Sequence, residues 1–452
     1  MHGIPKVFGK VGFPPGKSEL PLAGGDIGGT SVTDHQGAVG RFSLNPDYIR
    51  LLILYFIIHF ISYYMVINST RYKLIFLFLK DIFKIKSEYF LTTEQIVRLA
   101  PKVLLHDHLD GGLRAKTIIE LAADQRYNKL PTKDAGELAE WFHRGANKGS
   151  LTEYLLGFEH TCAVMQTKEA LRRVAYEMME DMRNDGVCYV ETRFAPSFHT
   201  AKGLYPEETV QAVLDGLEQG EKDFGVGYGL ILCGMRNMKN TLEIAELAVN
   251  FRNQKIVGFD LAGEEGGYPP KKHIEAFHFI QRANFNITIH AGEAFGKESI
   301  WQAIQWCGAH RIGHATHLIE DIFLDGLGNI VRFGELAQYI LDKRIPLEIC
   351  LLSNVHTGAV DRIENHPFNI LYKEKFRVTI NTDDRLMSDT NMTKEFMTAI
   401  SNFNLNLEDV EKISLNAMKS AFIPYKERLN YIYNIIKPGF QAIKDQLLSL
   451  KK

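Results

Sequence analysis

From Leu91 onward, eight short apolar runs alternate with longer segments of helical periodicity, and this alternation limits the fold more than any other feature. The apolar runs are residues 103–106, 188–194, 227–233, 256–261, 286–291, 311–314, 346–351 and 377–381. Between them lie helix-like segments such as 168–185, 207–224, 241–250, 271–283 and 299–307. Strands that alternate with helices pair in parallel, and eight such units favour a closed barrel over an open sheet. We therefore expect one α/β domain, a (β/α)8 TIM barrel, over residues 91–440.

The end of the chain continues the helical pattern beyond the eighth run. Residues 407–448 have the periodicity of helices that pack outside the barrel, and we expect residues 441–452 to form a helical tail. The chain has 452 residues, which is long enough to bury a large core.

The first 90 residues differ from the rest, and we treat them as an extension outside the barrel. Residues 1–46 are rich in Gly and Pro and lack apolar periodicity, which predicts a flexible segment. Residues 51–67 contain no Asp, Glu, Lys or Arg, and a basic segment follows them. This run is near the lower limit for crossing a bilayer, and it starts too far from Met1 for a cleaved signal peptide. Two interpretations stay open: a membrane anchor, or upstream sequence translated from a misassigned start, which we favour.

Charge and cysteine content restrict the partners and the compartment. The formal net charge is -2 at pH 7, which argues against a nucleic-acid partner and leaves small molecules open. The five cysteines are widely spaced and contain no C-x-x-C pair, so a reducing compartment is the default. We expect a cytoplasmic protein, or a membrane-anchored one if residues 51–67 are a real anchor. The sequence predicts no particular oligomeric state.

Polar residues gather where the predicted strands end, which is where a (β/α)8 barrel builds its active site. The strand ends carry His106 and His108, Gly263, His290 and Glu293, His314, and Asp383 with Asp384. Histidine nitrogens and a carboxylate that converge on one rim are typical of a divalent-metal site. In an extended segment, residues i and i+2 face the same way, so one strand can supply both His106 and His108. The neighbours Asp383 and Asp384 face opposite ways, so one can bind metal while the other faces substrate.

Other metal-site motifs are absent. His310 and His314 stand four residues apart, but the residues between them exclude the H-E-x-x-H motif of zinc proteases. The C-x-x-C half of the cytidine deaminase motif is missing. His317, His356 and His366 have no partner motif, and we assign them structural roles only.

Five strings closely resemble the motifs of the adenosine deaminase family, in the amidohydrolase superfamily. They are PKVLLHDHLDG at 101–111, GFDLAGEE at 258–265, HAGE at 290–293, RIGHA at 311–315 and NTDD at 381–384. They occur in the family's order and spacing, and NAMKSAF at 416–422 adds a carboxyl-terminal motif. The resemblance covers about residues 91–440.

The resemblance implies a ligand set and a role for each matched residue. One zinc ion per chain would be bound by His106, His108, His290 and Asp383. His314 would orient the attacking water, accept its proton and stabilise its charge. Glu293 would protonate the purine N1, Asp384 would bond N7, and the backbone amide of Gly263 would bond N3. Asp110 would accept a hydrogen bond from the ribose 5'-hydroxyl, and His108 would lie beside the same substrate.

The expected reaction is hydrolysis of adenosine and 2'-deoxyadenosine to inosine and 2'-deoxyinosine, with release of ammonia. One alternative is a deaminase of adenine, a modified AMP or another adenosine derivative. A second is a non-catalytic barrel that acts as a binding or signalling protein. Two residues depart from the family pattern: Glu264 stands where Asp is usual, and Arg385 where Pro is common. We expect both at the mouth of the barrel, where they affect substrate fit.

Overall fold

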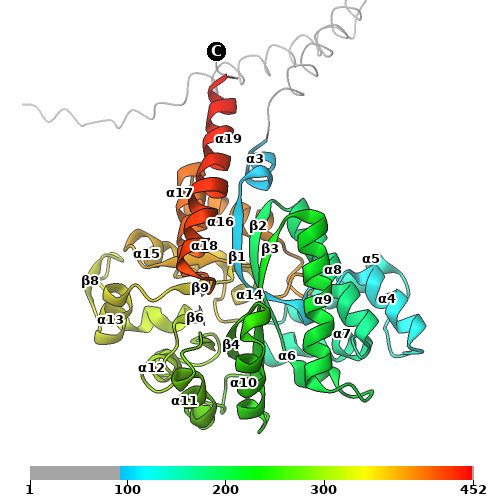
Figure 1. Ribbon diagram of the computed structural model, residues 1–452. Coiled ribbons are helices and arrows are strands. Elements are labelled where there is room, and N and C mark those ends of the chain that lie inside the picture. Colours follow the sequence, from blue (N-terminus) through cyan, green and yellow to red (C-terminus); the bar gives the residue numbers. More distant parts are fainter. Residues whose placement is uncertain (1–91, 450–452) are drawn as a thin grey trace, which may run out of the picture. The chain divides into compact units, whose positions relative to one another are not determined.

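The computed structural model describes residues 92–449 (Figure 1). The interpretations given above for residues 1–46 and 51–67 therefore lie outside the described residues. Across 92–449, no helix combines the length and the hydrophobicity needed to cross a membrane.

The described chain contains eight parallel strands in two sheets of four. One sheet has the order β1-β2-β3-β4 and the other β10-β9-β6-β5. The strands are β1 (Lys102–His108), β2 (Val187–Phe194), β3 (Gly227–Met235), β4 (Ile256–Ala262), β5 (Thr288–Ala291), β6 (Arg311–His314), β9 (Leu347–Ile349) and β10 (Val378–Ile380). Every pair within these two sheets is parallel.

Isolated parallel bridges join the two sheets at both seams. Phe259 pairs with Ile287 at one seam, and Asp107 pairs with Asp383 at the other. At the second seam the amide of Asn381 accepts a hydrogen bond from Leu105 N at 3.0 Å and donates one to Ile349 O at 3.3 Å. The strands thus follow one another in chain order, although the ladders form two sheets instead of one continuous closed sheet.

All eight predicted strands are present, and their boundaries differ by a few residues. The predicted run at 346–351 gives the short strand β9, because helix α14 (Leu351–His356) begins at its end. The run at 286–291 becomes a strand only at Thr288, because Ile287 forms an isolated bridge with Phe259 and no regular ladder.

Helices follow most of the strands and cover the sheets (Figure 1). Those in the predicted segments are α8 (Lys168–Asn184), α9 (Pro206–Phe224), α10 (Thr241–Asn250), α11 (Ile274–Arg282) and α12 (Lys297–Gln305). The predicted helix at 271–283 begins instead as a 3-10 turn, Pro270–His273, because Pro269 and Pro270 lack the backbone N–H of a regular helix. Besides α14, the helices between β6 and Leu407 are α13 (Glu335–Lys343), α15 (Phe368–Lys373) and α16 (Met392–Phe403).

Two features were not predicted from the sequence. Four helices lie between β1 and α8: α4 (Ala115–Asp124), α5 (Ala135–Ala146), α6 (Leu151–Leu155) and α7 (Phe158–Val164). A two-stranded antiparallel hairpin, β7 (Ile322–Leu324) with β8 (Ile330–Phe333), follows β6.

The predicted carboxyl-terminal helices are confirmed. They are α17 (Leu407–Ser420), α18 (Tyr425–Tyr431) and α19 (Lys437–Ser449), with a π-helical turn at Ile432–Ile436. Helix α17 contacts both β1 and β10, so it covers the outside of one seam. The helix α3 (Thr93–Leu99) precedes β1 and is closed by a capping box between Thr92 and Gln95.

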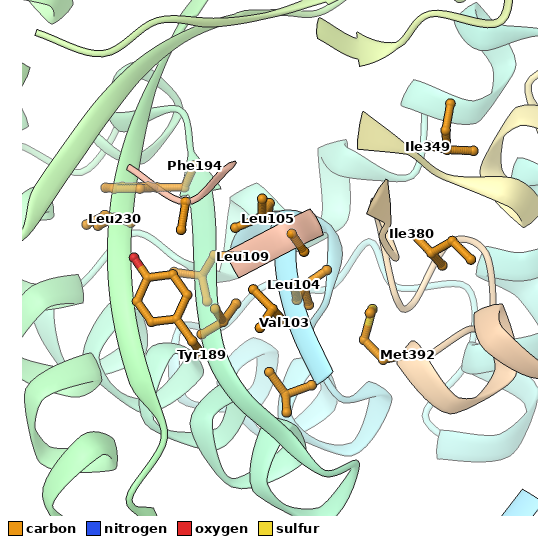
Figure 2. Close-up of a cluster of buried hydrophobic side chains, with 14 of the residues drawn as sticks. Val103, Leu104, Leu105, Leu109, Tyr189, Phe194, Leu230, Ile349, Ile380 and Met392 are labelled. Atoms are coloured by element: carbon orange, nitrogen blue, oxygen red, sulfur yellow. The ribbon is translucent and has the colours of Figure 1, made fainter. Parts of the chain in front are cut away.

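The core lies around the strands, which are buried on both faces. All seven residues of β1 are buried, among them Val103, Leu104 and Leu105 (Figure 2). Their neighbours come from distant parts of the chain, such as Tyr189 of β2 and Ile380 of β10. Each fully buried aliphatic side chain contributes about 1.5–3 kcal/mol. This packing holds the strands in register and so brings their polar carboxyl ends together at one rim.

Candidate active site

A cavity of about 260 Å³ opens at the rim formed by the carboxyl ends of the strands. Eight of the nine predicted site residues line it: His108, Asp110, Gly263, His290, Glu293, His314, Asp383 and Asp384. The ninth, His106, is fully buried beneath the others. Apolar side chains of α6 and α7, including Leu155 and Phe158, complete the wall.

Histidine nitrogens and one carboxylate converge at the floor of this cavity. Asp383 Oδ1 lies 3.1 Å from His106 Nε2 and 3.3 Å from His108 Nε2. His108 Nε2 lies 3.0 Å from His290 Nε2. Side-chain atoms of His106, His290, His314 and Asp383 also fall within 4.8 Å of one another. The cluster therefore holds the four expected ligands and His314, all buried, and it can bind a metal ion.

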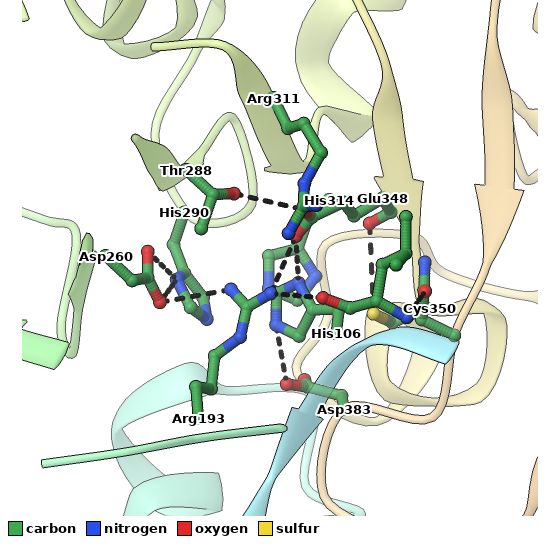
Figure 3. Close-up of polar contacts among 12 residues, drawn as sticks. His106, Arg193, Asp260, Thr288, His290, Arg311, His314, Glu348, Cys350 and Asp383 are labelled. Carbon is green, nitrogen blue, oxygen red and sulfur yellow. Dashed lines mark hydrogen bonds and ion pairs between the residues drawn. The ribbon is translucent and has the colours of Figure 1, made fainter. Parts of the chain in front are cut away.

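Buried carboxylates beneath the floor orient two of these imidazoles (Figure 3). His106 Nδ1 lies 2.9 Å from Glu348 Oε2, and His290 Nδ1 lies 3.1 Å from Asp260 Oδ2. The guanidinium of Arg193 donates to both carboxylates, at 3.0 Å and 3.1 Å. A carboxylate that accepts the Nδ1 proton leaves the Nε2 lone pair free to bind metal.

The sequence interpretation missed these orienting residues. Glu348, Asp260 and Arg193 each lie inside a predicted apolar strand and are fully buried. A charged residue inside a predicted buried strand indicates that an oppositely charged or hydrogen-bonding partner lies nearby, because a charge is rarely buried without one. This signal was present in the sequence. The sequence did not show which residue the partner is, since His106 and Glu348 are 242 positions apart.

The electrostatics keep most of the imidazoles neutral. Burial lowers the pKa of His108 to about 3, and burial also lowers the pKa values of His290 and His314. A neutral imidazole is the form that ligates metal. Asp383 accepts a hydrogen bond from Ser353 at 2.6 Å through Oδ2, which leaves Oδ1 directed at the histidines.

Burial and neighbouring charges favour the protonated form of two carboxyl groups in the cavity. Burial raises the pKa of Glu293 well above its usual value, and the charges of Asp383 and Glu265 raise it further. Burial also raises the pKa of Asp384, and Asp383 and Asp110 add to that effect. Glu293 Oε1 and Asp384 Oδ1 are buried and have no hydrogen-bond partner in the described structure. Both groups can therefore donate a proton to a bound molecule.

Asp110 has the opposite character. Burial acts to raise its pKa, but the hydrogen bond and charge of His199, together with His108 and the backbone of Ala195, outweigh burial and lower it. His199 Nε2 lies 3.5 Å from Asp110 Oδ2, and Ala195 N donates to the same oxygen at 3.3 Å. Asp110 is thus an ionised acceptor on the wall of the cavity.

The loop after β5, which carries Glu293, is held by one buried carboxylate. Glu265 accepts hydrogen bonds from the four consecutive backbone amides 292–295, at 2.7–3.0 Å. It is 3% exposed. Four charge-assisted hydrogen bonds fix the backbone on which Glu293 stands.

Backbone strain is concentrated in the same rim. His314 has φ 64° and Asp383 has φ 58°, in the left-handed region where a non-glycine residue costs about 1–3 kcal/mol. Such strain persists only where the surroundings impose it, and here it directs both side chains into the cavity. Gly111 makes room for another side chain of the cavity, because a Cβ at this position would clash with Asp384 Oδ1.

The two departures from the family pattern have different positions. Glu264 lines the cavity and accepts a hydrogen bond from Thr152 of α6 at 3.1 Å, as expected for a residue at the mouth. The expectation for Arg385 was wrong. It is buried, pairs with Asp107 at 2.7 Å and lines a separate cavity beside Arg114. The reason is that Asp107 faces away from His106 and His108 and needs a cation on that side.

Comparisons with known proteins agree with these motifs. The profile of the adenosine deaminase family matches residues 101–438. "Adenosine deaminase 1" of Streptomyces coelicolor is 52% identical over 357 residues, which cover 78% of this chain and 90% of that protein. The adenosine deaminase of Mycobacterium ulcerans is 50% identical over 356 residues, covering 78% of this chain and 98% of that protein.

Solved structures share the fold. The adenine deaminase of Arthrobacter aurescens has a TM-score of 0.67 and 25% identity, and the match covers 76% of this chain and 99% of that one. The family profile spans most of the chain, and relatives about half identical to it are adenosine deaminases along nearly their full length. The chain therefore belongs to the adenosine deaminase family.

Proposed function

We propose that this enzyme catalyses the zinc-dependent hydrolytic deamination of adenosine and 2'-deoxyadenosine to inosine and 2'-deoxyinosine, with release of ammonia. The observation that carries the proposal is one buried cavity that joins a histidine and aspartate cluster to the protonated Glu293. The substrate class follows from relatives that are named adenosine deaminases and are about half identical to this chain.

The residues present fit one zinc ion per chain. His106, His108, His290 and Asp383 would hold it, since imidazole nitrogens and a carboxylate oxygen are its usual ligands in catalytic sites. The buried Nε2 of His106 has no hydrogen-bond partner in the described structure, and Glu348 orients its ring from below. Bound zinc would supply a water ligand whose pKa is lowered to near neutrality.

The proton donors act on the purine ring. Glu293 gives its proton to N1, which makes C6 electrophilic toward the attacking water. The protonated Asp384 donates a hydrogen bond to N7, and the backbone amide of Gly263 donates one to N3. Gly263 has φ 96°, a conformation that only glycine adopts easily, and this turns its backbone toward the cavity. His314, which lines the same cavity, orients the attacking water.

Asp110 selects the nucleoside. Its ionised carboxylate accepts a hydrogen bond from the ribose 5'-hydroxyl, with His108 beside it. A 5'-phosphate would meet this carboxylate as a like charge, and like charges at close range in a shielded site cost several kcal/mol. Adenine would leave the carboxylate buried without that partner, which is also unfavourable.

The domain that carries this function is residues 91–440, with residues 1–90 outside it and 441–452 as a helical tail. We propose that the two sheets form one closed (β/α)8 barrel. Both seams carry a bridge, and Asn381 binds the strands on either side of one of them. All five cysteines are free thiols, which fits a reducing compartment, and we propose a cytoplasmic location.

The rival function is deamination of adenine or of a modified AMP, because such an enzyme would share the purine contacts. An ultraviolet assay on adenosine, adenine and AMP separates these functions. We expect kcat/KM for adenosine to exceed that for the other two by at least about 10²-fold. Asp110→Ala should lose much of the preference over adenine while zinc stays bound. A higher kcat/KM for adenine or AMP in the unsubstituted enzyme would contradict the substrate assignment.

A further inference from the structure

A chain of three hydrogen bonds lies behind His314, on the side away from the cavity. Phe368 N donates to His366 Nδ1 at 3.0 Å, His366 Nε2 lies 3.1 Å from Asn354 Oδ1, and Asn354 Nδ2 lies 2.9 Å from His314 Nδ1. All three side chains are buried, with exposures of 2% or less. The sequence interpretation gave His366 a structural role only, and Asn354 was not singled out.

The direction of every bond in this chain follows from its first donor. A backbone N–H can only donate, so His366 Nδ1 must be an acceptor that carries no proton. Burial lowers the pKa of His366 to about 3, so the ring is neutral and its one proton is on Nε2. That proton is donated to Asn354 Oδ1, which fixes the orientation of the amide. The NH2 of Asn354 therefore donates to His314 Nδ1.

We propose that this relay fixes His314 in the tautomer that carries its proton on Nε2, and that Asn354 and His366 are positioning residues for the reaction. The inference rests on the proposed function, which places the attacking water beside His314. His314 Nε2 is buried without a hydrogen-bond partner in the described structure and lies 3.6 Å from Glu293 Oε2. Its N–H is thus directed at the cavity.

The tautomer has a first consequence for the metal site. A ring nitrogen that carries a proton has no lone pair for a metal ion. His314 is therefore excluded as a ligand, although its side chain lies among the other donors. This leaves His106, His108, His290 and Asp383 as the set that binds zinc.

A second consequence concerns the attacking water. His314 donates a hydrogen bond to the water oxygen, which turns a lone pair of that oxygen toward C6. Because its Nε2 already carries a proton, His314 cannot accept the proton of the water. The family resemblance had implied that His314 accepts it. Glu293 is the acceptor for that proton, because its carboxylate is ionised once N1 is protonated and lies beside the same space.

Neutron diffraction from crystals of the deuterium-exchanged, unsubstituted enzyme tests the tautomer directly. We expect a deuteron on His314 Nε2 and none on Nδ1, together with a deuteron on His366 Nε2. A deuteron on His314 Nδ1 would overturn the proposal. This measurement does not depend on turnover, so it stays informative even if adenosine proves not to be the substrate.

The variant Asn354→Asp tests the functional role. A carboxylate can only accept, so it would draw the proton of His314 to Nδ1 and leave Nε2 without one. We expect kcat to fall by at least about 10²-fold, with KM within about threefold and zinc content unchanged. The matched control is His356→Gln, a buried histidine of the same helix whose ring contacts His143 and not the relay. It should keep kcat within about twofold, whereas a kcat near normal in Asn354→Asp would overturn the proposed role.

Discussion

Glu293 is the residue on which the proposed chemistry depends most, and its surroundings account for its protonation. Its carboxyl group is buried between two other acidic side chains, Asp383 and Glu265, and both raise its pKa. Arg236 lowers that pKa, but less than burial raises it. A carboxylic acid that stays protonated near neutral pH can deliver a proton to a ring nitrogen.

Replacing Glu293 by Gln keeps the shape of the side chain and removes the proton. We expect kcat to fall by about 10²–10⁴-fold, because an amide cannot protonate N1. Zinc measured by mass spectrometry should stay at one ion per chain, since Glu293 is not among the proposed ligands. A variant with kcat close to normal would mean that another group activates the ring.

Eight of the nine proposed site residues line one cavity, and this convergence was predictable because each stands at a strand end within a recognisable motif. The sequence did not predict the residues that hold them, since these depend on contacts between distant segments. Glu348 and Asp260 lie inside strands, and Asn354 contacts His314 across 40 positions. Arg385 was misplaced because the chain does not stay extended there: Asp383 has φ 58° and a turn begins at Arg385, which pairs with Asp107 outside the main cavity.

At the scale of elements, the loop after β5 shows how one side chain can fix a catalytic segment. Glu265 follows β4 and accepts all four amides 292–295, so two adjacent strand ends are joined by a single carboxylate. Arg236 at the end of β3 donates to the backbone of Tyr268 and of His290, which ties a third strand to the same loops.

The variant Glu265→Gln tests this arrangement. The amide keeps one acceptor oxygen but turns an NH2 toward backbone N–H groups, so we expect a loss of about 2–3 kcal/mol in the free energy of unfolding. Denaturant unfolding measures this loss, and kcat should fall as well because Glu293 is displaced. The adjacent and exposed Glu264 offers the control, since Glu264→Gln should change stability by less than about 0.5 kcal/mol. Equal stability of the two variants would exclude the proposed role of Glu265.

The hairpin and the two shortest helices among the elements missed from the sequence have a weak apolar pattern. The hairpin of β7 and β8 exposes Phe323, Leu324 and Val331, so its residues do not alternate between a core and a solvent face. The helices α6 and α7 are short, at 5 and 7 residues, and give too few turns for a clear periodicity. The eight parallel strands were predictable because each is a buried apolar run between helices.

For the whole molecule, every proposed site residue lies between His106 and Asp384, inside the part of the chain that matches the family profile. No ligand is assigned to residues 1–86. We therefore expect a shortened chain that begins at Ser87 to be soluble and fully active. Its kcat/KM should equal that of the full chain within about twofold, a difference of roughly 0.4 kcal/mol.

Aggregation or inactivity of this shortened chain, beside a well-behaved full chain, would show that residues 1–86 belong to the functional protein. Membrane fractionation of the native protein would then distinguish an anchor at 51–67 from a misassigned start.

The central claim is that one zinc ion in the His106, His108, His290 and Asp383 site makes adenosine deamination possible. The most direct measurement follows zinc content and adenosine loss in a single preparation while a chelator removes the metal and zinc is then returned. We predict about one zinc per chain at the start, loss of activity in proportion to the zinc removed, and recovery when zinc is restored. A preparation that stays active without metal would contradict the account.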